Sequence, residues 1–207
     1  MPTPNWARFT LLLFVAASFV ATLFVGILGH GVARYAGIGT IMSLVVLVLL
    51  VIDRWAWKWW GVRHLLRVPN LAGTWEVELK SDFKGEGGGL KTIYLVIHQT
   101  YSSVTVEVLT DLARSCSEAS SLTRRGPRLV LAYLYRAEPE AIRRDGNEPH
   151  RGAAELLIET GSELRFAGDY WTDRGNVGRM RSVGWNAQKC GSYAAASQAA
   201  FSAWGRA

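Results

Sequence analysis

The chain is poor in the residues that build metal and redox centres. Its 207 residues include only two cysteines, Cys116 and Cys190, and neither has a neighbour at a metal-ligand or redox spacing. This excludes a disulfide framework, a zinc site of cysteines and CxxC redox chemistry. One bridge between the two cysteines stays open, although a reducing cytoplasm disfavours it.

Residues for acid-base or nucleophilic catalysis are also scarce. The four histidines, at positions 30, 64, 98 and 150, are too scattered to form a recognisable catalytic cluster. The sequence contains no GxSxG nucleophile elbow and no Walker or dinucleotide-binding motif. A serine-rich stretch at 115–121 leaves open a hydrolase with an unfamiliar site, but we expect that the protein is not an enzyme and holds no metal or cofactor.

Charge is unevenly spread along the chain. The net charge of +6 comes mostly from residues 1–69, which carry six Lys and Arg against one Asp, whereas residues 70–207 carry seventeen against sixteen acidic residues. The basic surplus therefore accompanies the most apolar part of the chain. Binding of a DNA or RNA polymer is not expected.

Two long apolar runs occupy the N-terminal region. Phe9–Ala33 contains 25 residues and Tyr35–Ile52 contains 18 without Asp, Glu, Lys or Arg. Each run is close to the roughly 20 residues that cross a bilayer as a helix. We predict a short N-terminus at 1–8 and transmembrane helices at 9–30 and 34–53. A signal peptide is the competing interpretation of the first run.

The residues after the second run indicate its orientation. Basic side chains crowd residues 54–70, where the predicted juxtamembrane linker follows the membrane, and they favour the cytoplasmic side. Indole rings favour the membrane-water boundary, although core packing is an alternative for them. We predict a multi-pass membrane protein with both termini in the cytoplasm. The basic residues are Arg54, Lys58, Arg63 and Arg67, and the tryptophans are Trp55, Trp57, Trp59 and Trp60.

Short alternating segments separated by Gly, Pro, Asp and Ser follow Pro69. Trp75, Val77 and Leu79 alternate with polar residues, as is typical of a strand with one buried face. The connections are too short for crossover helices, so neighbouring strands should be antiparallel. We expect eight strands, at Thr74–Ser81, Thr92–Gln99, Ser103–Thr110, Ser115–Thr123, Arg128–Tyr135, Gly152–Thr160, Glu163–Thr172 and Val177–Trp185.

Eight such strands either split into two packed sheets or close on themselves, and closure leaves room for side chains or one small ligand. We predict an all-β, eight-stranded, up-and-down, lipocalin-like barrel at residues 71–186. The glycine run at 85–89 is interpreted as a hairpin loop and not a phosphate cradle, because no helix follows it. The Ala- and Ser-rich tail, 187–207, is either a short helix or irregular.

Polar and aromatic residues gather at the predicted strand ends. Tyr133 and Tyr135 share one face of their strand, as do Tyr170 and Thr172, and Arg174 follows. Aromatic rings stack on nucleobases and a guanidinium binds phosphate oxygens in a forked geometry. For any single tyrosine, ordinary packing in a sheet is the simpler explanation. As a group, these residues indicate a ligand site.

Several short segments occur in an order that carries a resemblance to a known family. They are Asn70-Leu-Ala-Gly-Thr-Trp75, Ile97-His-Gln-Thr100, the serine-rich 115–121, Leu131-Ala-Tyr-Leu-Tyr135, His150-Arg-Gly152 and Gly168-Asp-Tyr-Trp-Thr-Asp-Arg174. With two apolar spans before them, they resemble the SMODS-associated effectors of bacterial CBASS anti-phage operons, which have two transmembrane segments and a β-strand-rich domain.

The resemblance implies a function. The barrel would bind a cyclic dinucleotide or related cyclic oligonucleotide made by a neighbouring CD-NTase-type nucleotidyltransferase. Homo-oligomers would then disrupt the lipids of the inner membrane and end the infection by cell death. The alternative is a tethered barrel that binds a small apolar ligand or a protein partner. The expected ligand-binding residues are Tyr133, Tyr170, Thr172 and Arg174, followed by Gln99, Thr100, Ser117 and His150.

Overall fold

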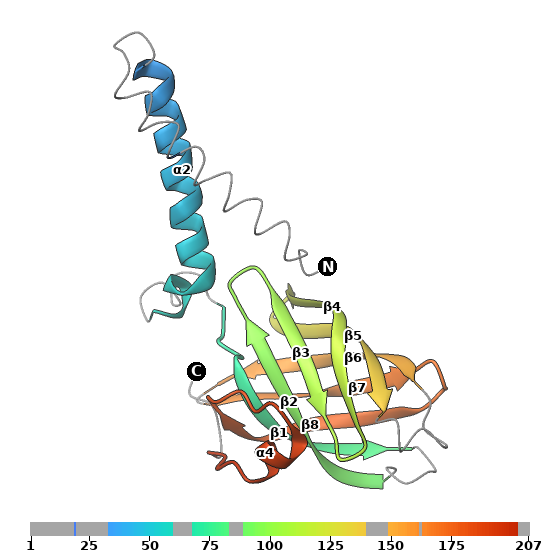
Figure 1. Cartoon of the computed structure of the whole chain (residues 1–207). Coiled ribbons are helices and arrows are strands. Elements are labelled where there is room, and N and C mark those ends of the chain that lie inside the picture. Colours follow the sequence, from blue (N-terminus) through green and yellow to red (C-terminus); the bar gives the residue numbers. More distant parts are fainter. Residues whose placement is uncertain are drawn as a thin grey trace. The chain divides into compact units, whose positions relative to one another are not determined.

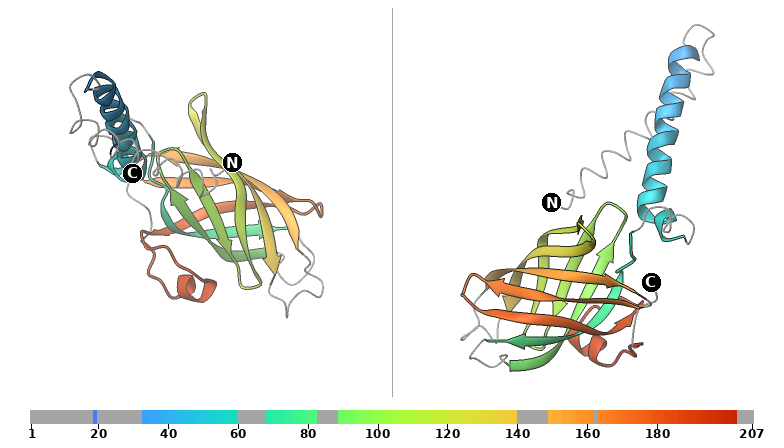
Figure 2. Two further views of the ribbon diagram at one scale, coloured as in Figure 1. Left: turned by 45° about the horizontal axis from the view of Figure 1, so that its top comes forward. Right: turned by 180° about the vertical axis from the view of Figure 1, so that it is seen from behind.

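The structure is a computed structural model that describes residues 19, 33–59, 68–82, 89–139, 149–161 and 163–202. The chain separates into two compact units, one spanning Thr3–Val68 and the other containing Pro69–Ala207. Figure 1 shows the labelled elements of both units, and Figure 2 shows the strands from two further sides.

The first unit contains the helix α2 (Ala33–Arg54) and a short 3-10 helix, η1 (Ala56–Lys58). The predicted second span, 34–53, falls within α2, whereas the predicted first span, 9–30, lies outside the described residues except for Phe19. Within the described residues, no helix meets the length and hydropathy needed to span a membrane.

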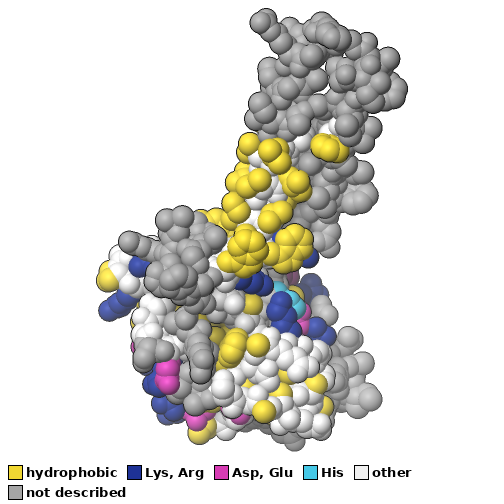
Figure 3. All heavy atoms as spheres, turned by 90° about the vertical axis from the view of Figure 1, so that its left-hand side faces the viewer, with side chains coloured by type: hydrophobic (Ala, Val, Ile, Leu, Met, Phe, Trp, Pro, Cys, Tyr) yellow, Lys and Arg dark blue, Asp and Glu magenta, His cyan; other side chains and the backbone are white. Residues whose placement is uncertain are grey.

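Hydrophobic side chains of α2 are exposed along its described part (Figure 3). Met42, Leu44 and Leu49 are each more than half exposed. Of the tryptophans that follow the helix, Trp57 is fully buried, while Trp55 and Trp59 are exposed. Trp60 lies outside the described residues.

The second unit is a closed barrel of eight antiparallel strands in sequential order, as predicted from the alternation. Each strand pairs with the next along the chain, and β1 pairs with β8 to close the wall. The strands are β1 (Gly73–Ser81), β2 (Gly89–Gln99), β3 (Val104–Leu109), β4 (Ala113–Arg125), β5 (Arg128–Pro139), β6 (His150–Thr160), β7 (Leu164–Thr172) and β8 (Val177–Asn186).

Alternation along the strands fills the interior of the barrel. Trp75 and Val77 are fully buried on β1, and their rings and methyl groups belong to a core that includes Leu95, Leu131 and Phe166. The Trp75 ring lies 5.1 Å from the Phe166 ring, centroid to centroid, and its Nε1 donates to the Leu71 carbonyl at 2.8 Å. This half of the interior is closely packed, and we call it the packed end.

The tail forms a strap on the outside of the barrel. After β8 it contains the short helix α4 (Tyr193–Ser197), and Ser202 bridges back to Trp185. Tyr193 and Phe201 lie 5.4 and 5.5 Å from the Tyr94 ring, and Cys190 donates its backbone N–H to Thr74 Oγ1. The tail is therefore a docked element with a short helix. Cys116 and Cys190 are both free thiols.

Candidate functional site

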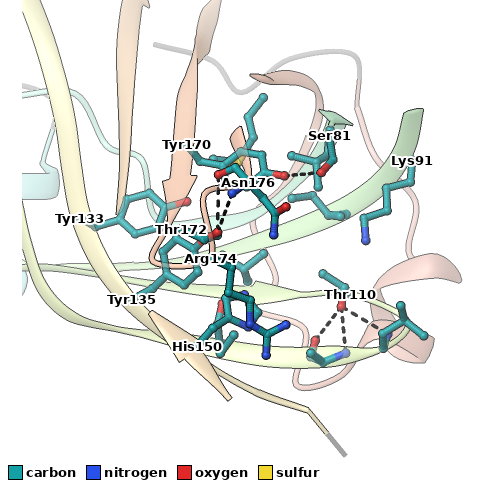
Figure 4. A pocket seen from close by; sticks show the side chains of 18 residues that line it. Ser81, Lys91, Thr110, Tyr133, Tyr135, His150, Tyr170, Thr172, Arg174 and Asn176 are labelled. Carbon is teal, nitrogen blue, oxygen red and sulfur yellow. Dashed lines mark hydrogen bonds between the residues drawn. The ribbon is translucent and has the colours of Figure 1, made fainter. Parts of the chain in front are cut away.

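A pocket opens at the end of the barrel opposite the packed end (Figure 4). Its cavity volume is about 150 Å³. All eight strands and two turns contribute. The polar and aromatic lining residues are Ser81, Lys91, Thr110, Ser115, Tyr133, Tyr135, His150, Tyr170, Thr172, Arg174 and Asn176.

Two tyrosines of β5 form one wall of the pocket. Tyr133 and Tyr135 point inward because they are two residues apart in one strand, and their ring centroids are 5.9 Å apart. Burial raises the pKa of both phenols, so both are neutral hydroxyls near neutral pH. They can therefore donate as well as accept a hydrogen bond.

The Tyr133 hydroxyl is the most informative group in the pocket. Tyr133 is only 3% exposed, and within the described part of the chain its hydroxyl has no hydrogen-bond partner. A buried polar group without a partner costs about 1–3 kcal/mol. Because the hydroxyl lines a pocket, a ligand that bonded to it would relieve this cost.

Tyr170 of β7 is held in place from the facing strands. Its hydroxyl donates to Ser81 Oγ at 2.6 Å, across to the end of β1. Gly178 of β8 lies beside the ring, and a Cβ at that position would come within 2.4 Å of Tyr170 Cε1. Gly152 of β6 makes the same kind of space for Tyr135, because a Cβ there would come within 2.4 Å of Tyr135 Cζ. The two glycines thus accommodate the two rings.

Cationic groups lie around the mouth. Figure 4 shows Arg174 next to His150, with Lys91 on another side of the pocket. Burial lowers the pKa of Lys91, although the nearby Asp111 opposes this effect. Arg174 stands on the turn between β7 and β8, which Gly175 allows by adopting a φ of +77°.

Hydrogen bonds fix this turn beneath Arg174. The Asn176 N–H donates to Thr172 Oγ1 at 3.2 Å, and the Gly175 N–H donates to the Thr172 carbonyl at 3.0 Å. The role of Thr172 in this structure is therefore partly to hold the turn. The pocket as a whole offers flat rings, neutral hydroxyls and a cationic rim, which suits a small anion with planar groups.

The structure brings five of the eight predicted site residues together. Tyr133, Tyr170, Thr172, Arg174 and His150 all line the pocket.

The other three predicted residues lie elsewhere and bind the backbone or a turn. Gln99 accepts from the Leu71 N–H at 2.7 Å and donates to the Pro69 carbonyl at 3.1 Å, toward the packed end. Thr100 bonds to Ser103 within the β2–β3 turn. Ser117 accepts from the Val106 N–H at 3.0 Å beside a bulge in β4.

Sequence reasoning left out other residues that line the pocket. Tyr135 and Ser115 line the pocket but are not among the predicted ligand-binding residues, although Tyr135 has the same strand parity as Tyr133. Lys91 and Ser81 lie at the facing ends of β2 and β1, and inward parity near a strand end was the signal that could have identified them.

Arg179 and Arg181 share one face of β8 and are exposed on the outside of the barrel. The Arg181 guanidinium is 2.7 Å from Glu78 Oε2, and the Arg179 side chain is exposed. Neither residue lines the pocket. In the described residues, no group of three His, Cys, Asp or Glu side chains could hold a metal ion.

A closed antiparallel barrel with a polar, aromatic and cationic pocket defines a class of small-molecule-binding barrels. The family model described as "Cap15, cyclic dinucleotide receptor domain" matches residues 66–183, more than half of the chain. The chain belongs to this Cap15 cyclic dinucleotide receptor family.

A curated relative supports this assignment. The chain is 29% identical over 129 residues to "CD-NTase-associated protein 15" of Staphylococcus schleiferi. The aligned part is 62% of this chain and 68% of that protein. Together with the family match, this likeness supports a CBASS effector that binds a cyclic nucleotide in a barrel.

Proposed function

We propose that the pocket at the open end of the barrel binds a cyclic dinucleotide and that binding activates the protein as an anti-phage CBASS effector. The observation that carries this proposal is the buried Tyr133 hydroxyl, which lines the pocket and has no partner among the described residues. The family match supports the ligand class, and the cationic rim supports an anionic ligand.

Each pocket group has a proposed role. Tyr133 reads a polar edge of a base deep in the pocket, and Tyr135 and Tyr170 contact the flat faces of the bases or ribose rings. Arg174 and Lys91 bind the two phosphates at the mouth, where charge-assisted hydrogen bonds are strong. None of these roles requires turnover of the ligand, so the proposed activity is binding and not catalysis.

The proposed messenger source and output follow from the family and the apolar N-terminal region. A CD-NTase-type nucleotidyltransferase makes the messenger, bound barrels assemble into homo-oligomers, and the apolar segments at 9–30 and 34–53 disrupt the inner membrane with both termini in the cytoplasm. The exposed apolar side chains of α2 support a lipid environment for that helix. A ligand can drive assembly only if it binds the assembled form better.

A thermal-shift screen of the full-length chain in detergent tests the binding proposal. A panel of cyclic di- and trinucleotides is compared with fatty acids as apolar ligands, because a ligand of the folded state raises the melting temperature by mass action. We expect a shift with a cyclic dinucleotide that the Arg174→Ala variant weakens. A shift with fatty acids alone, unaffected by that variant, would favour an apolar-ligand carrier. Hydrolysis of the added nucleotide, lost in Ser115→Ala, would favour an enzyme.

A further inference from the structure

A row of apolar side chains crosses the outside of the barrel wall directly behind the pocket. The strand registers place Leu134 opposite Ala153, Ala153 opposite Trp171, and Trp171 opposite Val177. We call these four residues the outer row. Leu134, Trp171 and Val177 are 55%, 48% and 52% exposed. Figure 2 (right) shows their strands, β5 to β8, side by side in the wall.

Another apolar surface on the outside of the barrel is covered, whereas the outer row is exposed. On β2 and β3, the outward-facing Tyr94, Val96 and Leu109 are buried beneath the C-terminal strap, against Tyr193 and Phe201. Within the described residues, no comparable element buries the large side chains of the outer row. Ala153, between Leu134 and Trp171, is only 8% exposed, so the exposed surface of the row comes from its three large side chains. A patch of several exposed apolar side chains is typical of an interaction site.

Charged residues flank the outer row in a pattern that is complementary to itself. On one side, Arg136 lies opposite Arg151, and the Asp173 carboxylate accepts the Arg151 N–H at 3.0 Å, which gives the order plus, plus, minus. The Arg151 guanidinium also lies 3.7 Å from Glu118 Oε2 of the same chain, and both side chains are exposed.

On the other side of the row, Glu155 lies opposite Asp169, and Asp169 lies opposite Arg179, which gives minus, minus, plus. Arg125 of the same chain also pairs with the exposed Glu155 carboxylate at 2.9 Å, so a partner's arginine would join this ion pair. Each residue on this side has a residue of opposite sign on the first side, one strand earlier in the barrel. The pairs are Glu155 with Arg136, Asp169 with Arg151, and Arg179 with Asp173. The two flanks are therefore opposite in sign, residue by residue, after a shift of one strand.

We propose that the outer row is a two-fold interface between two copies of this chain. A two-fold axis that lies nearly along the row packs the apolar side chains against their own copies, as an isologous contact requires. A slight tilt of that axis sets Arg136 against Glu155, Arg151 against Asp169 and Asp173 against Arg179 of the partner copy. A closed barrel has no free strand edge through which copies could join, so the contact must use side chains.

The inference rests on the proposed function in one respect, which is control by the ligand. Leu134 stands between Tyr133 and Tyr135, and Trp171 stands between Tyr170 and Thr172, so the same strand segments line the pocket inside and carry the outer row outside. A ligand that fixes the positions of these strands also fixes the shape of the outer row. Binding and assembly are thereby coupled through the thickness of one sheet.

The first test truncates the centre of the row in the full-length chain in detergent. At protein concentrations too low for assembly, Trp171→Ser should leave the affinity for the cyclic dinucleotide within about twofold of the wild type, because the side chain points away from the pocket. At higher concentrations with ligand present, self-association should weaken about 30-fold, as on loss of a central interface Trp. Leu90→Ser, at an apolar residue of β2 that is 72% exposed, is the matched control and should change neither property. Titration calorimetry measures binding, and sedimentation velocity measures assembly.

The second test uses charge reversal. Arg151→Glu and Asp169→Arg should each reduce assembly, whereas an equal mixture of the two variants should restore it, because each foreign charge then meets its complement. Asp169 pairs with Glu155, four residues along β6 from Arg151 and about 13 Å away, so a bond within one chain cannot cause the rescue. Arg128→Glu, at the exposed β4–β5 turn, is the control and should assemble normally.

The results separate the interface from the proposed function. Normal assembly of Trp171→Ser, or mixtures that do not recover, would overturn the two-fold interface even if the dinucleotide binds. Reduced binding of lipid vesicles by Trp171→Ser with assembly intact would assign the row to a lipid surface and also overturn it. If the wild type binds no dinucleotide, the proposed function fails, and the interface is then judged by the same variants on self-association at high protein concentration.

Discussion

The two ends of the barrel are made by the same alternating strands but are filled in opposite ways. At the packed end, Trp75 contacts Phe166 and Trp185, and its Nε1 is hydrogen-bonded to the Leu71 carbonyl. At the open end, the buried Tyr133 hydroxyl has no partner in the described chain, and Lys91 carries a lowered pKa. The packed end is filled by its own side chains. The open end holds buried polar groups whose desolvation is unfavourable, and a bound ligand would offset that free energy.

The largest effect should come from the packed end. Trp75→Ala removes a fully buried indole between two aromatic rings, so the free energy of unfolding should fall by about 3–5 kcal/mol. Urea denaturation followed by circular dichroism measures it. A loss below about 1 kcal/mol would mean that this end is not the stabilising core.

At the open end, Arg174→Ala should weaken dinucleotide binding about 10- to 100-fold with little change in stability, because it removes a charge-assisted hydrogen bond to phosphate. Arg181→Ala is the matched control, since Arg181 is exposed outside the barrel and paired with Glu78. Titration calorimetry at two salt concentrations checks both. Equal losses in the two variants would indicate a nonspecific charge effect and not a pocket contact.

Tyr133→Phe should change stability and dinucleotide affinity in different ways. Removing the unpartnered hydroxyl should leave stability unchanged or raise it, while dinucleotide affinity falls about 3- to 10-fold. Thermal melts without ligand and titrations with it give the two quantities. A variant that loses stability and keeps full affinity would show that the hydroxyl serves the fold.

The smallest effect concerns proton uptake at Lys91. Burial lowers the pKa of Lys91 below the ordinary 10.5, because it makes the charged form less favourable in the folded barrel than in the unfolded chain. Stability is therefore gained as pH rises from the lowered pKa toward the ordinary one. A phosphate beside it raises the pKa again. Binding should therefore take up a fraction of a proton at a pH between the two values, and affinity should fall as pH rises through that window.

Calorimetry in buffers of different ionisation enthalpy measures this uptake. Lys91→Met is the control and should remove the uptake that Lys91 contributes. The same uptake in that variant would assign the proton to another group.

The barrel could be predicted from the sequence because period-two alternation is local. Trp75, Val77 and Leu79 show which face of β1 is buried, and short turns leave sequential antiparallel pairing as the simplest arrangement. The docked tail could not be predicted in this way. Its contact depends on Tyr94 pointing outward beneath Tyr193 and Phe201, and residues nearly a hundred positions apart leave no periodic signal.

The site was predicted in part for a similar reason. Tyr133, Tyr170 and Arg174 were found from parity and side-chain chemistry. Gln99 has chemistry equally suited to a nucleotide, but its place at the end of β2 lies toward the packed end, where it bonds to Pro69 and Leu71. Residue type does not say at which end of a barrel a strand terminus lies, whereas the order of the strands does.

Photolabelling tests the central claim most directly. A cyclic dinucleotide with a photoreactive azide on its bases is irradiated with the full-length chain, and labelled peptides are identified by mass spectrometry with and without excess unlabelled ligand. The account predicts competed labels on β5 around Tyr133 and Tyr135 and on the β7–β8 segment from Tyr170 to Asn176. Competed labels confined to the packed end or to the outer surface of the strands would contradict it.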